Sequence, residues 1–154
     1  MSELRRDDPR LDLLRHWLEQ GLGWQSYDLA PASADASFRR YFRVVRGDET
    51  AIVMDAPPPQ EDVRPFVHIA GLIAHAGLNA PRVLEADEQQ GFLLLTDLGQ
   101  QPYLQTLADS TPEHADALMR DALAALVRFQ QRVDGSSLPA YDDEHPHWHV
   151  IEDG

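Results

Sequence analysis

The sequence contains no cysteine, which excludes disulfide bonds, thiolate catalysis and zinc sites with cysteine ligands. It also contains no lysine, because all 13 basic residues are arginines. Genome composition explains such a bias without any functional cause. The bias nevertheless excludes a lysine Schiff base and a lysine-bearing phosphate loop, so bound phosphate would have to be held by arginine, backbone N–H groups or a metal ion.

Long apolar runs are absent as well, and the residues that follow Met1 are polar and charged. No segment approaches the roughly 20 apolar residues that span a bilayer, so we expect a cytoplasmic protein with no membrane partner. The net charge of −13 argues against a nucleic-acid partner, because nucleic-acid phosphates require a basic surface. The 154 residues are enough for about one ordinary domain.

A helix followed by three strands is predicted for the first part of the chain. Asp8-Pro9 is typical of a helix start, and apolar residues follow at helical spacing: Leu11, Leu14, Trp17, Leu18 and Leu22. The next predicted elements are a strand at 26–29, a flexible turn of small residues (31–36), a strand at 38–45 and a strand at 51–54 that ends before three prolines.

Helical periodicity dominates the rest of the chain, interrupted by one strand hairpin. The predicted order is a helix (60–76) closed by Gly77, two strands (81–86 and 91–96), a break at 97–99, a short helix near 103–107 and a long helix (112–133). Five strands with one inserted helix, followed by helices alone, predict an α+β fold in which an antiparallel sheet lobe joins a helical lobe.

Several short segments resemble, in the same order, the aminoglycoside phosphotransferase superfamily, which has a protein-kinase-like fold. They are 34–44 (ADASFRRYFRV), 52–59 (IVMDAPPP), 64–66 (RPF), 77–81 (GLNAP) and 92–99 (FLLLTDLG). Within the superfamily the chain is most similar to the amino-sugar kinases that phosphorylate the anomeric hydroxyl of N-acetylmuramate and N-acetylglucosamine in cell-wall recycling. The resemblance covers residues 9–142.

The resemblance implies the organisation of the chain. Residues 1–96 would form a nucleotide-binding N-lobe, with an N-terminal helix before a five-stranded antiparallel sheet and its inserted helix. A hinge (97–100) and the first helices of a truncated helical C-lobe (101–142) would follow. The tail, 143–154, diverges and we expect it to be disordered; its histidines and carboxylates are compatible with a metal site, but such terminal tracts are more often merely disordered.

The resemblance also implies a phosphate-binding turn before the second strand. Its small residues would let backbone N–H groups approach the phosphates, and Ser37, Arg39 and Arg40 would add side-chain donors. Arginines beside aromatic residues on a strand are also typical of a solvated, stacked surface, and this alternative stays open for both arginines. We assign Arg43 and Arg46 to such a surface.

The break after the fifth strand would be the hinge. By resemblance, the backbone of Thr96, Asp97 and Leu98 would receive the adenine edge, although a strand that simply ends before a glycine gives the same pattern. Val53 and Leu95 would wall the adenine pocket, but each also fits an ordinary core position. We expect the turn near Ser37 and the break near Asp97 to come together as opposite walls of one nucleotide cleft.

Two departures from the superfamily pattern limit the prediction. The lysine that kinase-like folds place on the third strand is absent; the similar amino-sugar kinases lack it too, and Arg39 or Arg40 would have to compensate. The catalytic loop of the form His-x-Asp-x-x-x-x-Asn is also absent, because His114, Asp116 and Asp121 have the spacing but lie within a predicted helix. We therefore assign no catalytic residue and no metal ligand.

The sequence thus predicts the nucleotide-binding half of an ATP-dependent small-molecule phosphotransferase, inactive alone. Its full-length form would use ATP and Mg²⁺ on an amino sugar. Two alternatives remain: a non-catalytic, truncated or degenerate fragment that serves as an interaction module, or a kinase for an aminoglycoside, choline or homoserine. The apolar face of the long helix, with Leu118, Leu126 and Phe129, would be partly exposed without the rest of its lobe, which favours self-association.

Overall fold

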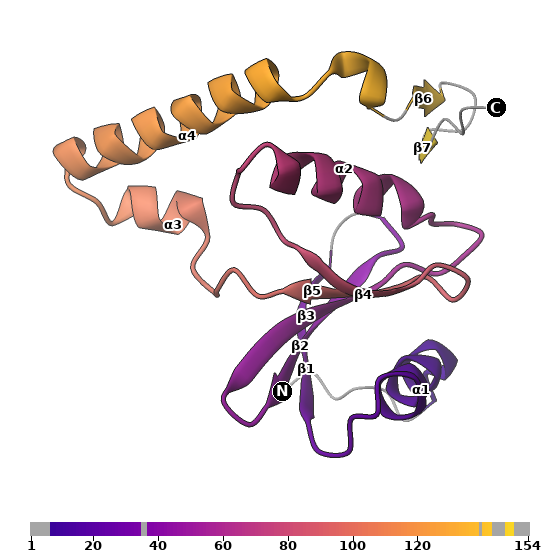
Figure 1. Cartoon of the computed structure of the whole chain (residues 1–154). Coiled ribbons are helices and arrows are strands. Elements are labelled where there is room, and N and C mark those ends of the chain that lie inside the picture. Colours follow the sequence, from indigo (N-terminus) through magenta and orange to yellow (C-terminus); the bar gives the residue numbers. More distant parts are fainter. Residues whose placement is uncertain (1–6, 35–36, 139, 143–146, 150–154) are drawn as a thin grey trace. The chain divides into compact units, whose positions relative to one another are not determined.

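The computed structural model describes residues 7–34, 37–138, 140–142 and 147–149 (Figure 1). The chain forms two compact units. The first consists of Met1–Val67 and Pro81–Asp97, and the second of His68–Ala80 and Leu98–Gly154. Within the described ranges, no helix has both the length and the hydropathy of a membrane-spanning segment.

The first unit begins with helix α1 (Pro9–His16), which continues as a short π-helix, η1 (Trp17–Gly21). Asp8 caps α1, because its side chain accepts a hydrogen bond from the backbone N–H of Leu11 at 3.1 Å. The predicted apolar stripe faces inward: Leu14 and Leu18 are fully buried. The predicted helix and its start at Asp8-Pro9 are therefore confirmed.

A five-stranded antiparallel sheet forms the body of this unit, with strand order β1-β2-β3-β5-β4. The strands are β1 (Asp28–Ala34), β2 (Arg40–Arg46), β3 (Glu49–Asp55), β4 (Val83–Asp87) and β5 (Phe92–Thr96). The prediction of an α+β fold with a five-stranded antiparallel, kinase-like N-lobe sheet is confirmed.

Strand β1 is longer than predicted, because the small residues expected to form a flexible turn continue the strand to Ala34. Pro31 is tolerated there because β1 is an edge strand, and the pairing with β2 shifts register between Pro31 and Ser33. Strand β2 begins at Arg40 rather than at Phe38, whose side chain is 65% exposed.

The two faces of the sheet bury different clusters. On one side, which we call the α1 face, sheet residues pack against α1 and η1: Phe42, Val44, Ala51, Val53, Phe92 and Leu94. On the opposite face another set packs together with Val63, Phe66 and Val67: Tyr41, Ile52, Met54, Leu93 and Leu95. Because β3 and β5 are covered on both faces, their sequences are continuous apolar runs rather than alternating patterns.

Gly91 lies where the end of β3 approaches the start of β5. Its φ is 77°, and a Cβ added there would lie 1.9 Å from the backbone oxygen of Ala56. The backbone N–H of Ala56 donates to the Gly91 carbonyl oxygen at 2.8 Å, so the two segments cannot move apart without losing this bond. Only glycine fits this position without rearrangement.

The second unit contains mostly helices. Helix α2 (Arg64–His75) enters it from the first unit and ends at Gly77, whose φ is 75°. The closing hydrogen bonds run from Leu78 N–H to Ile73 O at 3.2 Å and from Gly77 N–H to Ala74 O at 3.0 Å, a Schellman motif. The predicted C-cap is therefore confirmed, although α2 begins four residues later than expected.

Helices α3 (Tyr103–Ala108) and α4 (Pro112–Arg132), a 3₁₀ turn η2 (Gly135–Ser137) and the strands β6 (Ala140–Asp142) and β7 (His147–His149) complete this unit. The segment from His114 to Asp121 lies inside α4, where Asp116 pairs with Arg120 at 2.7 Å. It is regular helix, as predicted, and not a catalytic loop. Of the tail expected to be disordered, 147–149 pairs with β6, and 143–146 and 150–154 lie outside the described residues.

Helix α4 buries none of its side chains, although one stripe of it is apolar. Leu118 and Phe129 are half-buried and Leu126 is 51% exposed, so the predicted partial exposure of this face is confirmed. Met119 and Leu123, which are also about half exposed, extend the apolar stripe.

Two Gly→Ala substitutions test the close approach at Gly91. We expect Gly91→Ala to lower the free energy of unfolding by about 3 kcal/mol or more, because the new Cβ collides with backbone and φ is unfavourable. Gly71→Ala, in the interior of α2 with open space around it, should instead stabilise by about 0.5–1 kcal/mol. Urea denaturation followed by circular dichroism measures both. Equal denaturation midpoints for Gly91→Ala and the parent chain would contradict the described approach.

Candidate functional site

The turn before β2 is held by one glutamate. The backbone N–H of Phe38 donates to Glu61 Oε1 at 3.3 Å, and Arg39 Nε donates to Glu61 Oε2 at 2.8 Å. The Ser37 hydroxyl accepts from the backbone N–H of Arg39 at 3.2 Å. Burial is the largest single influence on Arg39 and opposes its charged form, but the hydrogen bond and charge of Glu61, together with Tyr41, outweigh burial and raise the pKa of Arg39 above its ordinary value. The turn therefore presents a fixed, permanently charged guanidinium.

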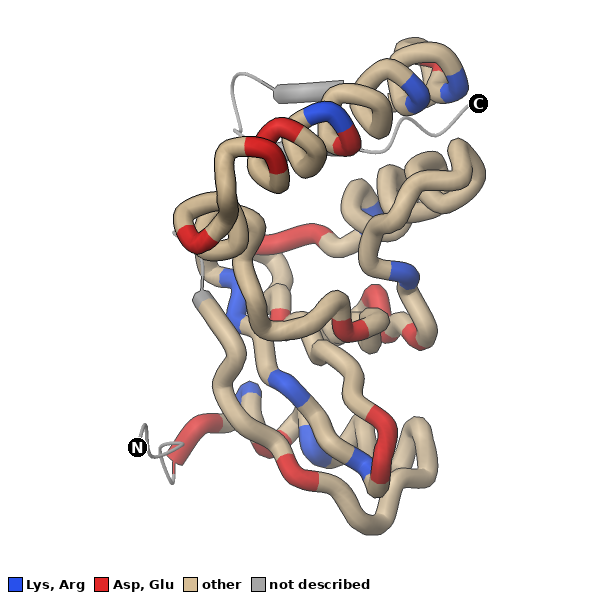
Figure 2. Tube along the Cα trace, turned by 90° about the vertical axis from the view of Figure 1, so that its left-hand side faces the viewer, with Lys and Arg blue, Asp and Glu red and all other residues tan. Residues whose placement is uncertain are grey.

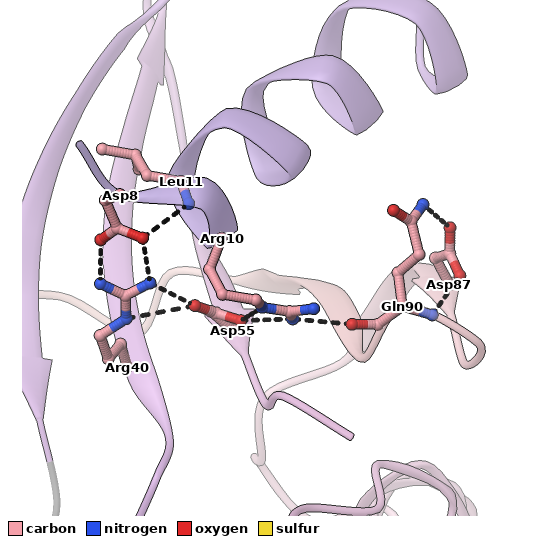
Figure 3. A network of polar contacts seen from close by, with 7 residues as sticks. All are labelled: Asp8, Arg10, Leu11, Arg40, Asp55, Asp87 and Gln90. Carbon is pink, nitrogen blue, oxygen red and sulfur yellow. Dashed lines mark hydrogen bonds and ion pairs between the residues drawn. The ribbon is translucent and has the colours of Figure 1, made fainter. Parts of the chain in front are cut away.

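Arg40, the next residue, belongs to a different cluster on the α1 face (Figure 3). Its Nη1 donates to Asp8 Oδ2 at 2.5 Å, and its Nη2 and Nε donate to Asp55 Oδ2 at 2.6 and 3.1 Å. Asp55 is fully buried and also accepts two bonds from Arg10, at 2.5 and 3.0 Å. We call these four residues the Asp55 network. Its two carboxylates and two guanidinium groups alternate, so its charges cancel.

The Asp55 network joins four segments of the first unit. Arg40 and Asp55 are partners in the β2–β3 register. Arg10, from α1, also donates to the backbone oxygen of Gln90 at 2.7 Å and lies 4.4 Å from the centroid of the Phe92 ring. Among the described residues, no buried side-chain nitrogen or oxygen lacks a hydrogen-bond partner. The network was not anticipated from the sequence, where its one signal is an aspartate at the end of a buried apolar strand.

Strand alternation separates the residues predicted to form the nucleotide site. Arg40 and Val53 are on the α1 face, whereas Leu95 is on the opposite face. Val53 and Leu95 are 0% and 3% exposed, and the sheet backbone lies between their side chains, so they do not line one pocket. The residue that pairs with Leu95 across β3 and β5 is Ile52. Sequence reasoning missed it, because alternation within one strand does not give the register between two strands.

The predicted hinge residues are held by partners outside β5. The backbone N–H of Thr96 donates to Arg82 O at 3.0 Å, and its hydroxyl accepts from Arg82 N–H at 2.9 Å. Asp97 accepts from Arg43 Nε at 2.8 Å and Nη2 at 3.1 Å, and this hydrogen bond raises the pKa of Arg43. Leu98 is 57% exposed. Arg43, expected to be a solvated surface residue, instead anchors the end of β5 to β2.

The Ser37 turn and the Asp97 break lie at opposite ends of the strands. Arg40 pairs with Asp55, and Thr96 pairs with Ala51, which is four residues away along β3. At about 3.3 Å per residue this separation is about 13 Å. The two segments are therefore not neighbours, and a ligand that contacts both must be extended. Basic and acidic positions are interspersed along the chain trace (Figure 2). Ion pairs join Arg39 to Glu61, Arg40 to Asp55 and Arg43 to Asp97.

Comparison with known proteins gives a family and several relatives. The sequence profile of the phosphotransferase enzyme family (APH) matches residues 28–149. The N-acetylmuramate/N-acetylglucosamine kinase of Pseudomonas aeruginosa is 51% identical over 147 residues, covering 89% of this chain and 43% of that protein. Proteins of the same name from Pseudomonas putida and Neisseria meningitidis are 41% and 36% identical, over 93% and 91% of this chain and 47% and 44% of their own length. The chain thus spans less than half the length of these curated relatives.

The Asp55 network should make stability depend on acid pH through Asp8. The hydrogen bond from Arg40 lowers the pKa of Asp8 below its ordinary value of 3.8. Its contribution is therefore fully present above that value and is lost as the pH falls through the folded pKa. Asp8→Asn keeps a good helix cap but removes the charge. We expect it to cost about 1 kcal/mol at neutral pH and to flatten the loss of stability in acid.

Urea midpoints measured from neutral pH to about pH 3 check this expectation. The pH range ends at about 3 because this value lies just below the ordinary pKa of aspartate. Asp12→Asn, which removes an exposed carboxylate from the same helix, is the control and should keep the acid dependence of the parent chain. Identical acid profiles for Asp8→Asn and the parent chain would show that the Asp8–Arg40 pair contributes nothing.

Proposed function

The chain belongs to the phosphotransferase enzyme family, and from this we propose that it supplies the nucleotide-binding half of an ATP-dependent amino-sugar kinase of the cytoplasm. The observation that carries the proposal is the 51% identity, over most of this chain, to a kinase named for N-acetylmuramate and N-acetylglucosamine. The five-stranded sheet and its inserted helix agree with a nucleotide-binding lobe of that family. Recognition of these sugars is carried over from the names of the relatives, and a role in cell-wall recycling follows only from the family resemblance; both are parts of the proposal.

We place the nucleotide along the face of the sheet that bears Leu95. Its phosphates lie at the Ser37–Arg39 turn and its base lies toward Thr96, Asp97 and Leu98. An extended nucleoside triphosphate suits a separation of about 13 Å between these ends. A guanidinium has five N–H donors, so Arg39 can contact Glu61 and a phosphate at once. Arg40 and Val53 lie on the α1 face. There Arg40 pairs with Asp8 and Asp55, Val53 packs in the apolar core, and neither contacts the nucleotide.

Phosphoryl transfer depends on positioning and on charge stabilisation, with Mg²⁺ neutralising the phosphates. The described residues contain no group of three or more His, Asp or Glu side chains that could hold a metal ion. The described part of the chain therefore offers no such cluster for Mg²⁺. In this proposal the catalytic aspartate and the metal ligands come from the part of the relatives that this chain does not match.

An interaction module is the second candidate, and the apolar stripe of α4 favours it. Met119, Leu123, Leu126 and Val127 are each about half exposed on one helix. Exposed apolar surface of this kind promotes association, either with a second copy of the chain or with another protein segment. Kinases for an aminoglycoside, choline or homoserine remain alternatives on the enzyme side, since the sheet lobe says little about the acceptor.

Binding of Mg-ATP tests the nucleotide site. We expect millimolar Mg-ATP to raise the melting temperature of the chain, because a ligand that binds only the folded state stabilises it by mass action. Arg39→Gln should weaken Mg-ATP affinity about tenfold, the loss of one charge-assisted contact. Arg40→Lys, which keeps a cation beside Asp8 and Asp55, should retain the parent affinity. An absent shift, or equal affinities for Arg39→Gln and the parent, would reject the proposed site.

The second expectation concerns turnover. The purified 154-residue chain with Mg-ATP should phosphorylate N-acetylmuramate and N-acetylglucosamine no faster than buffer alone, because its sequence has no loop of the form His-x-Asp-x-x-x-x-Asn. Release of ADP, followed with each sugar and with no sugar, measures this directly. Sugar-dependent turnover above the no-sugar control would show that the chain carries its own catalytic group.

A further inference from the structure

A hollow of about 660 Å³ lies within the first unit, on the α1 face of the sheet. Val44, Ala51 and Leu94 form part of its lining, and all three belong to the α1-face cluster. The residues proposed to contact the nucleotide's phosphates and base lie on the opposite face or at the strand ends, so the hollow is a separate feature. Its volume falls within the range of about 300–1,000 Å³ that is typical of small-molecule sites.

One wall of the hollow is an aromatic ring covered by an arginine whose charge is already matched. The guanidinium carbon of Arg46 lies 4.5 Å from the Trp24 ring centroid. Arg46 Nη2 also donates to Glu49 at 3.0 Å, and all three residues line the hollow. Because Glu49 neutralises Arg46, the stack of Arg46 on Trp24 gives this wall a flat surface without a net positive charge.

The other wall is formed by a bulge in β4. The pairing of β4 with β5 shifts register between Val83 and Glu85, which brings both Leu84 and Glu85 to the lining of the hollow. Bulges commonly re-aim side chains in this way. Within the described residues, the Glu85 carboxylate has no hydrogen bond or ion pair. With Arg46 and Glu49 cancelling, Glu85 leaves the hollow with a net charge of −1.

We propose that this hollow binds a small organic cation, an aromatic amine whose ring packs against the Arg46–Trp24 stack and Leu94 and whose ammonium group pairs with Glu85. The net negative charge and the apolar floor favour such a ligand over an anion, and in particular over a nucleotide. The inference goes beyond the proposed kinase function and does not depend on it, because it uses none of the residues assigned to the nucleotide.

Three ligands with the same indole ring test the proposal: tryptamine (cation), tryptophol (neutral) and indole-3-propionate (anion). Each is titrated into the isotope-labelled 154-residue chain, with and without Mg-ATP, and backbone amide shifts are followed by NMR. We expect tryptamine to shift amides of β4 and of the β2–β3 hairpin and to bind about threefold more tightly than tryptophol, as one partly exposed ion pair provides. Indole-3-propionate should bind most weakly, and Mg-ATP should leave tryptamine binding unchanged.

Two variants that remove the same charge locate the interaction. Glu85→Gln should reduce tryptamine affinity to that of tryptophol and leave tryptophol binding unchanged. Glu88→Gln, in the turn of the same hairpin but outside the lining, should keep the preference for tryptamine. The proposal is overturned if tryptamine does not bind, if it binds no better than tryptophol, or if its preference survives in Glu85→Gln. A chain that binds tryptamine but not Mg-ATP would reject the nucleotide site alone.

Discussion

The buried carboxylate of Asp55 sets the constraint on which the sheet unit depends. A charge with no exposed surface is tolerated only when partners neutralise it, and here two guanidinium groups from separate segments do so. Arg10 must come from α1 and Arg40 from β2, so the ion pairs fix where the helix lies against the strands. The same requirement holds Arg40 between two carboxylates on the α1 face, whereas Arg39, the arginine used in the proposed nucleotide site, pairs with Glu61.

Most elements of the fold could be predicted from the sequence, because helices impose regular spacing on apolar residues and strands covered on both faces form continuous apolar runs. Strand β1 shows the limit of that approach. Its segment 30–34 consists of alanine, serine and proline, which carry no strand pattern, and it is a strand because the edge of β2 supplies backbone partners whatever the side chains are. Tertiary pairing, rather than local preference, decides the structure there.

The candidate site was less predictable, because its decisive contacts join residues far apart in the sequence. Arg39 meets Glu61 across 22 positions, Arg40 meets Asp55 across 15 and Arg43 meets Asp97 across 54. No spacing rule connects such pairs before the strand order is known. The sequence did not reveal that Val53 and Leu95 lie on opposite faces for a related reason: alternation within each strand is visible in the sequence, but the register that joins β3 to β5 is not.

The strand order also has a consequence for biosynthesis. Strand β3 pairs with β5, so the sheet cannot close until the residues up to Thr96 have left the ribosome. Until then the nascent chain presents β3, an apolar strand, with an unpaired edge, and such edges are prone to mispairing. This intermediate therefore persists for the time needed to translate about forty further codons, at roughly 5–20 residues per second of synthesis.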